Sequence, residues 1–199
     1  MKHVSLILAS GSPRRRELLS QMGVVYLCDP ADIDETTIAA EPPRDYVQRM
    51  ASTKAAVVAA RHSLSDNVVL AADTSVVIDG DVLGKPVDHL DGLAILARLS
   101  GRKHTVMTAV CLQGAEEQVT QLVTTEVEFI QLTREICEAY LATSEPWDKA
   151  GAYGIQGLGG ALVKSISGSY SNVVGLPLFE TWQMLSAVGV TTSLGRNDG

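Results

Sequence analysis

The sequence predicts an α/β protein with a mixed β-sheet flanked by helices. In the first half of the chain, apolar segments of strand length alternate with segments of helical character. Two long β-rich segments follow, residues 103–113 and 118–132, and the short connection between them predicts an antiparallel pair. Alternating strands and helices beside such a pair are typical of an α/β fold with a mixed sheet. No linker interrupts the chain, so a second lobe would have to come from inserted elements.

The N-terminal elements carry clear boundary signals. Residues 4–9 are an apolar run of strand length. The next helix has Ser12 as its N-cap, Pro13 at the first helical position and Gly23 at its end. The elements that follow are a strand at 24–29, an acidic loop at 30–42, a long helix at 43–62 and a buried strand at 68–73.

Turn residues mark the elements of the second half. Asp79 and Gly80 predict the turn of a hairpin over residues 75–84, and Gly101 ends a helix over 88–100. The remaining predicted elements are a helix at 133–143, a glycine-rich region at 144–175 with a short strand at 161–166, and a final helix at 176–189.

Size and composition indicate a single domain over residues 1–190, followed by a frayed tail at 191–199. The 199 residues are 46% hydrophobic and 20% charged, which excludes a disordered chain. No apolar run approaches the roughly 20 residues that span a bilayer. Arginines follow the first apolar run, whereas a signal peptide places its charge before that run, so we expect a cytoplasmic protein with no membrane partner.

The net charge of −7 disfavours a nucleic-acid partner, because binding to the phosphate backbone needs a broad basic surface. A few basic groups focused in one site can still bind an anionic small molecule. The four histidines show no metal-binding spacing, and the chain has no nucleophile-elbow motif.

The first candidate site motif is LASGSPRRR at residues 8–16, where a strand ends, a small-residue turn follows and a helix starts. A helix N-terminus carries partial positive charge, and glycine lets the backbone approach an anion closely. The alternative is an ordinary strand–turn–helix corner with solvated arginines.

Lys54 lies in the middle of the apolar stripe of the 43–62 helix, on the same face as Met50 and Val58, whereas Arg49 lies opposite. Two interpretations stay open for its ammonium group. It reaches into a cleft toward a phosphate, or it extends along the protein surface to solvent.

Asp73 ends the predicted strand at 68–73, and the ends of strands are where α/β proteins gather their functional groups. A carboxylate that caps a loop is the alternative. Glu35 in the acidic loop and Lys85 after the hairpin are weaker candidates on their own, because charged loop residues are usually just solvated.

The glycine-rich segment at 144–160 lacks the spacing of a dinucleotide-binding fingerprint. It carries the amide side chain of Gln156, which could read the edge of a base together with backbone groups. A flexible surface loop is the alternative interpretation.

Taken in order, these motifs closely resemble the Maf family of nucleotide pyrophosphatases over residues 4–186. The resemblance is carried by LASGSPRRRELL, AADTSVVIDGDVLGKP, SGRKHTVMTAV, EPWDKAGAYGIQGLGG and GSYSNVVGLPLFET. It implies an elongated α/β fold with two lobes and a central cleft, similar to inosine-triphosphate pyrophosphatase. It also implies hydrolysis of a nucleoside triphosphate to the monophosphate and pyrophosphate with a divalent metal cation, Mg²⁺ or Mn²⁺.

The resemblance also implies roles for individual residues. Asp73 would be the catalytic acidic residue, acting as proton acceptor or metal ligand, and Glu35 is a matched polar position whose carboxylate can offer the metal a second hard oxygen ligand. The other matched polar positions are Ser10, Arg15, Lys54 and Lys85. The branch of the family that acts on dTTP and UTP is identified by three further positions, which are Arg14, Thr74 and Gln156 here.

Two functions remain open at this stage. The first is an enzyme that removes pyrimidine triphosphates, including modified ones, in a house-cleaning role. The alternative is a nucleotide-binding regulator of cell division and septum formation with weak or no turnover. A homodimer is compatible with the sequence, although no stripe of residues identifies its interface.

Overall fold

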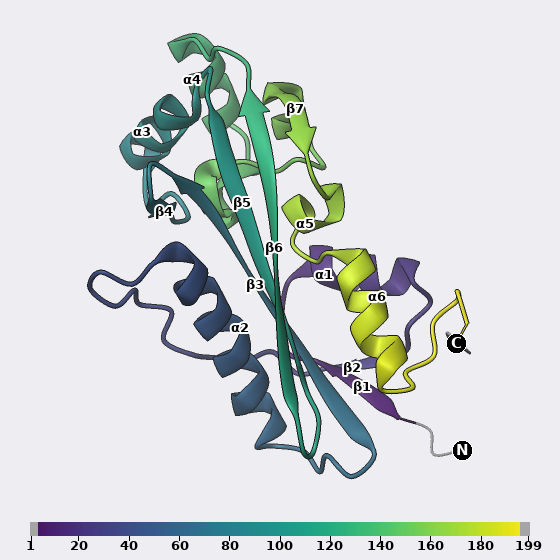
Figure 1. Ribbon diagram of the computed structural model, residues 1–199. Helices are drawn as coiled ribbons and strands as arrows, with labels where there is room; N and C mark the ends of the chain where they lie inside the picture. Colours follow the sequence, from purple (N-terminus) through teal and green to yellow (C-terminus); the bar gives the residue numbers. More distant parts are fainter. Residues whose placement is uncertain (1–3, 196–199) are drawn as a thin grey trace. The chain divides into compact units, whose positions relative to one another are not determined.

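The computed structural model describes residues 4–195 (Figure 1). Its strands are β1 (Ser5–Leu8), β2 (Tyr26–Cys28), β3 (Asn67–Ile78), β4 (Asp81–Leu83), β5 (Lys103–Gln113), β6 (Gln118–Phe129) and β7 (Val163–Ser167). Its α-helices are α1 (Pro13–Gln21), α2 (Pro43–Ala59), α3 (His89–Leu99), α4 (Arg134–Leu141), α5 (Tyr170–Val174) and α6 (Leu178–Ala187). Three short 3₁₀ helices lie at η1 (Pro146–Asp148), η2 (Ala150–Ala152) and η3 (Leu158–Leu162).

The strands of the described chain form one seven-stranded sheet in the order β2-β1-β3-β5-β6-β7, with β4 paired to β3. β1 runs parallel to both β2 and β3, whereas the β3–β4 and β6–β7 pairs are antiparallel. β5 and β6 are neighbours joined by residues 114–117, and so short a connection requires an antiparallel pair. The predicted mixed α/β sheet is therefore confirmed.

β3 is longer than the sequence analysis predicted. The hairpin turn is confirmed, because Ile78 pairs with Asp81 and both Asp79 and Gly80 have positive φ, at 55° and 85°. However, β3 continues without a break from Asn67 to Ile78, so the prediction that a strand ends at Asp73 is wrong. The β-branched residues after Asp73 favour the extended chain, and pairing with β4 supports it.

The predicted helices are present with adjusted ends. α2 ends at Ala59, three residues before the predicted end at 62, and β2 is shorter than the predicted strand at 24–29. α5 was not predicted. The hydroxyl of Ser169 accepts a hydrogen bond from the Asn172 backbone N–H at 3.2 Å at its start, a local contact that favours the first turn.

The chain forms two compact units, each built from segments that are not contiguous in the sequence. Within the described residues, unit 1 comprises 4–73, 108–122 and 175–195, and unit 2 comprises 74–107 and 123–174. In unit 1, α2 lies on one side of the strands and α1 with α6 on the other (Figure 1). The fully buried side chains of unit 1 include Leu8, Leu19, Met50, Val58, Leu70 and Leu185.

The single domain over residues 1–190 stays a prediction. Part of the predicted frayed tail at 191–199 lies in the described chain, where Thr192 is buried and the Ser193 N–H donates to the Met22 carbonyl at 2.8 Å. Residues 196–199 lie outside the described part. None of the helices in residues 4–195 is long and apolar enough to cross a membrane.

The core of unit 2 contains a buried histidine within an aromatic cluster. His104 is 3% exposed, and its Nε2 lies 2.9 Å from the hydroxyl of Tyr153. Its ring packs edge-on against Phe129 and Tyr153, with centroids 5.0 and 5.5 Å away. Burial lowers the pKa of His104 to about 4, so the ring is neutral at physiological pH.

This burial should make the stability of the protein pH-dependent. In the unfolded chain His104 has an ordinary pKa of about 6.5. The unfolded state therefore binds more protons than the folded state between pH 6.5 and 4, and stability falls as the pH is lowered through this window. When the pH is lowered from 7.5 to 4.5, the wild type should lose free energy of unfolding relative to His104→Phe. We expect this relative loss to be about 2 kcal/mol.

Urea unfolding of both proteins at the two pH values measures this difference. His104→Phe also removes the hydrogen-bond partner of Tyr153, but that loss is the same at both pH values. Parallel pH profiles for the two proteins would show that His104 titrates normally in the folded state.

Candidate active site

At the carboxyl end of β1, unit 1 brings two chain segments together: the turn that follows β1 and the middle of β3. Leu8 is level with Leu70, and the Ala9 N–H donates to the Leu70 carbonyl at 2.8 Å. The chain then leaves β1 through a turn, whereas β3 continues. Asp73 therefore lies beyond the carboxyl end of the parallel strand β1, beside the turn that begins at Ser10, at the sheet edge where α/β proteins bind ligands.

Lys54 is the centre of the charged groups at this edge. It projects from the buried stripe of α2, and its Nζ lies 2.7 Å from Asp73 Oδ1 and 2.6 Å from Glu35 Oε1. The side chains of Lys54 and Asp73 are only 11% and 12% exposed, whereas that of Glu35 is 49% exposed. The ammonium is paired with two carboxylates and does not extend along the surface to solvent, while its contact with a phosphate stays a prediction.

Arg15 adds a second positive charge, and two of its hydrogen bonds help to hold it in place. Its Nε donates to the Gly175 carbonyl at 2.9 Å, and its Nη1 donates to the Ser10 hydroxyl at 3.3 Å. Burial lowers the pKa of Arg15, the carboxylate of Asp73 counteracts this effect, and Arg14 adds to it. An arginine stays charged under such conditions, so Arg15 presents a fixed cation near the two carboxylates.

The start of α1 supplies backbone donors beside these charges. Ser12 occupies the N-cap position as predicted, but its side chain makes no capping bond. Ser10 performs part of that task, since its hydroxyl accepts from the Ser12 N–H at 3.2 Å. The first N–H groups of a helix favour an anion. Arg14, half-buried, lies in this first turn.

The structure thus brings together Ser10, Arg15, Glu35, Lys54 and Asp73 within unit 1. Thr74 follows Asp73 in β3 and is half-buried. Lys85 and Gln156 belong to unit 2, and both are exposed. Lys85 lines a cavity of about 280 Å³ that is bordered by Leu83, Asp91, Ile95 and Arg98, among others.

The glycine-rich segment that carries Gln156 is tightly organised around Glu145. The Glu145 carboxylate accepts hydrogen bonds from the backbone N–H groups of Leu158 and Gly159, at 2.8 and 2.9 Å. It also accepts from the Tyr140 hydroxyl at 2.8 Å. Burial acts to raise the pKa of Glu145, but these hydrogen bonds together outweigh it, and the pKa is lowered. These hydrogen bonds hold the segment in a defined conformation, which argues against the alternative interpretation of it as a flexible surface loop.

Close backbone packing explains a glycine in this segment. A Cβ atom at position 159 would lie 2.8 Å from the Gly154 carbonyl oxygen and 2.9 Å from the Gly154 nitrogen, closer than real side chains come. Gly159 thus allows two stretches of backbone to touch, which sets the path of the chain on either side of Gln156.

Sequence analysis did not single out Glu41, Tyr46 and Arg49, whose contacts organise the acidic loop in unit 1, or Glu145, whose contacts organise the glycine-rich segment in unit 2. Arg49 lies opposite the buried stripe of α2, where solvent exposure was the natural expectation, yet it pairs with Glu41 at 2.6 Å. Glu145 stands beside the residues singled out in its motif. The pairing of Arg49 with Glu41 and the hydrogen bonds of Glu145 do not follow from helical spacing, because each joins segments that come together only in the folded chain.

The chain belongs to the Maf family, since its residues 5–188 match the family described as Maf-like protein. It is 52% identical over 193 residues to a dTTP/UTP pyrophosphatase of Shewanella oneidensis, covering 94% of this chain and 100% of the relative. A dTTP/UTP pyrophosphatase of Methylobacillus flagellatus is 51% identical, covering 93% of each chain. Among solved structures, a HAM1 protein from Coxiella burnetii matches with a TM-score of 0.43 and 16% identity, over 66% of this chain and 75% of that one.

The donor atoms at the site suit a hard cation shared with a ligand. Among residues 4–195, no three histidine, cysteine or acidic side chains form a group that could hold a metal by themselves. Mg²⁺ usually takes only one or two carboxylates and completes its shell with water and phosphate oxygens. Glu35 and Asp73 converge on the same ammonium group, so their carboxylates fit such a shared site.

Removing the charge of Lys54 should destabilise the protein strongly. Lys54→Met leaves the buried Asp73 carboxylate without its cation, and we expect it to lower the free energy of unfolding by about 3 kcal/mol. Asp73→Asn leaves Lys54 paired with Glu35 and should cost only about 1 kcal/mol. Urea unfolding at neutral pH measures both values.

The double variant Lys54→Met/Asp73→Asn tests the cause. It contains no buried charge at this position, so it should be more stable than Lys54→Met alone. If the two losses simply add, the pairing of Lys54 with Asp73 does not explain the cost.

Proposed function

We propose that the protein is a nucleoside triphosphate pyrophosphatase that hydrolyses dTTP and UTP to the monophosphate and pyrophosphate. The observation that carries this proposal is the position of Lys54 between Glu35 and Asp73, next to Arg15 and the start of α1. Positive groups and helix N–H donors suit a triphosphate, and a carboxylate among them suits activation of water. Several curated relatives of about 50% identity carry the name dTTP/UTP pyrophosphatase, which supports the choice of reaction and substrate.

Charge balance favours a divalent cation in this reaction. The two positive side chains Lys54 and Arg15 are offset by the two carboxylates, so they leave little net attraction for a highly charged anion. Glu35 and Asp73 would hold Mg²⁺ or Mn²⁺ together with the phosphate oxygens, and the ion would neutralise phosphate charge as a Lewis acid. This role explains why acidic side chains lie beside the binding site of an anion.

The side chains of unit 1 would perform the remaining tasks. Arg15, Ser10 and the first N–H groups of α1 bind phosphate oxygens, and Lys54 stabilises negative charge as the bond breaks. Asp73 orients a water molecule and accepts its proton as the water oxygen bonds to the α-phosphorus and pyrophosphate leaves. Lys85, carried by unit 2, is proposed to contact the leaving pyrophosphate.

We assign base selection to Arg14, Thr74 and Gln156. An amide both donates and accepts hydrogen bonds, so Gln156 can match the N3–H and a carbonyl of uracil or thymine. The two bases share this edge, which accounts for the acceptance of both. The organisation of the segment by Glu145 supports this assignment, because base reading needs a fixed side chain.

The cytoplasmic location and the homodimer also stay predictions.

Replacing the Asp73 carboxylate should abolish turnover while the nucleotide still binds. Asp73→Asn keeps the size of the side chain but cannot accept the proton, so we expect kcat for UTP to fall by about a hundredfold to ten-thousandfold. The dissociation constant for UTP without added metal should not rise, because the variant keeps every positive group and loses one negative charge. Steady-state kinetics and calorimetry measure the two quantities.

Product analysis on the wild type tests the function itself. With Mg²⁺ or Mn²⁺, UTP and dTTP should yield UMP and dTMP with pyrophosphate, and purine triphosphates should react slowly. Release of a diphosphate and inorganic phosphate would identify the wrong bond. Binding of nucleotides with no turnover of any of them would favour the regulator of cell division instead.

A further inference from the structure

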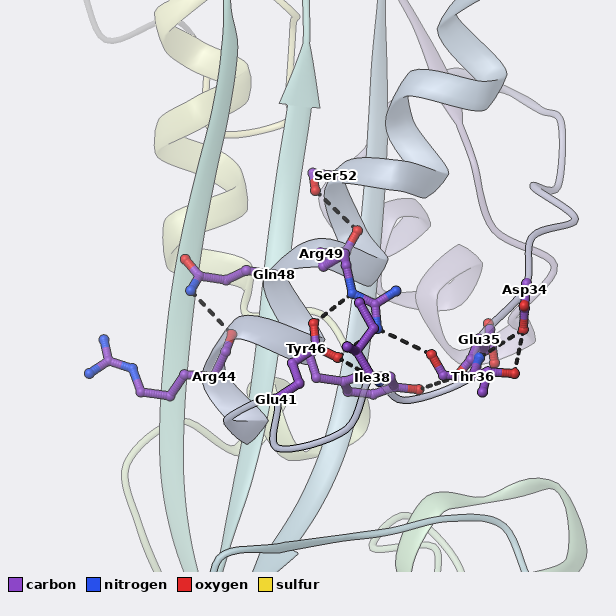
Figure 2. Close-up of polar contacts among 10 residues, drawn as sticks. All are labelled: Asp34, Glu35, Thr36, Ile38, Glu41, Arg44, Tyr46, Gln48, Arg49 and Ser52. Atoms are coloured by element: carbon purple, nitrogen blue, oxygen red, sulfur yellow. Dashed lines mark hydrogen bonds and ion pairs between the residues drawn. The ribbon is translucent and has the colours of Figure 1, made fainter.

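The acidic loop is fastened to α2 by an ion pair that the proposed chemistry does not use. Arg49 Nε lies 2.6 Å from Glu41 Oε1, and its Nη2 lies 2.6 Å from Oε2, so the guanidinium meets both carboxylate oxygens (Figure 2). Such paired, charge-assisted bonds fix direction as well as distance. The Arg49 and Glu41 side chains are 30% and 10% exposed, so water screens this pair less than an ordinary surface pair.

The same region of α2 also holds the loop backbone at Glu35. The Tyr46 hydroxyl donates to the Glu35 carbonyl at 3.0 Å, and Arg49 Nη2 donates to the Thr36 carbonyl at 3.2 Å (Figure 2). The Arg49 guanidinium lies over the Tyr46 ring, 5.5 Å from its centroid, so the two side chains support one another. Two successive carbonyl groups of the loop are thereby fixed to one helix.

A local turn completes the shape of this stretch. Asp34 Oδ1 accepts hydrogen bonds from the Thr36 N–H at 2.9 Å and from the Thr36 hydroxyl at 2.6 Å. Closer to α2, the Glu41 N–H donates to the Ile38 carbonyl at 3.0 Å. Glu35 thus lies in a stretch that is held by its own side chains and by α2 at the same time.

We infer that Glu41, Tyr46 and Arg49, together the Arg49 clamp, set the position of the Glu35 carboxylate for binding of the divalent cation. The inference rests on the proposed function, and it assigns Arg49 as a positioning residue. Glu35 is half-exposed and lies on a loop, where an unrestrained backbone would lose conformational freedom when the side chain binds a metal. Fixing the backbone in advance reduces that loss.

The electrostatics agree with this geometry. Hydrogen bonding to Arg49 lowers the pKa of Glu41, so the ion pair between the two side chains is maintained at neutral pH.

Arg49→Met tests the inference, with Arg44→Met as the matched control. Figure 2 shows the Arg44 side chain on the same helix, directed away from the loop. We expect Arg49→Met to weaken binding of Mn²⁺, measured by electron paramagnetic resonance in the presence of a non-hydrolysable UTP analogue, by about tenfold. The apparent KM for Mn²⁺ in UTP hydrolysis should rise by a similar factor, and Arg44→Met should change neither value.

Two further variants separate positioning from general loss of structure. In a Glu35→Gln background, Arg49→Met should have no additional effect on Mn²⁺ binding, because its effect passes through the Glu35 carboxylate. Arg49→Met/Glu41→Gln, which leaves no unpaired carboxylate at the clamp, should bind Mn²⁺ as weakly as Arg49→Met.

The outcomes distinguish this inference from the proposed function. If the wild type is active and Arg49→Met binds Mn²⁺ with the same affinity as the wild type, the inference is overturned and the proposed function stands. An equal loss in the Glu35→Gln background also overturns it, since Arg49 would then act by another route. A wild type that hydrolyses no nucleoside triphosphate overturns the proposed function, and Mn²⁺ binding then reports on the clamp by itself.

Discussion

The buried ammonium group of Lys54 is the interaction on which the arrangement of the site depends. A cation in a largely apolar stripe is costly unless opposite charges accompany it. Asp73 and Glu35 provide those charges from β3 and from the acidic loop, two segments that are distant in the sequence. Charge pairing thus forces a helix, a strand and a loop to meet at one point, and each charged group keeps the others in place.

Three structural features place the charged groups around the Lys54 ammonium. The parallel pairing of β1 and β3 sets Asp73 beside the turn after β1, and α1 begins directly beyond this turn with Arg15 in its first turns. The apolar stripe of α2 fixes the direction of Lys54. The same helix holds the loop through Tyr46 and Arg49 on another face. One helix therefore carries both the central cation and the contacts that place one of its partners.

Local signals predicted much of the fold, and the family resemblance supplied the candidate site residues, whereas contacts between distant segments were not predictable. Ser12, Pro13 and the Asp79-Gly80 turn act within a few residues, and the structure has them where the sequence analysis expected. The continuation of β3 past Asp73 depends on pairing with β4, which no local rule contains. The two interpretations of Lys54 could not be separated for the same reason, because its partners Glu35 and Asp73 come from other segments.

The most direct test of the account is a crystal structure with Mn²⁺ and a UTP analogue whose α–β bridge resists hydrolysis. The anomalous signal of manganese locates the ion independently of the protein chain. We predict that it is bound by the Glu35 and Asp73 carboxylates together with phosphate oxygens, with Lys54 and Arg15 in contact with the triphosphate. A manganese ion held by the phosphates alone, with the Lys54 ammonium still paired only with the two carboxylates, would contradict the central role assigned to Lys54.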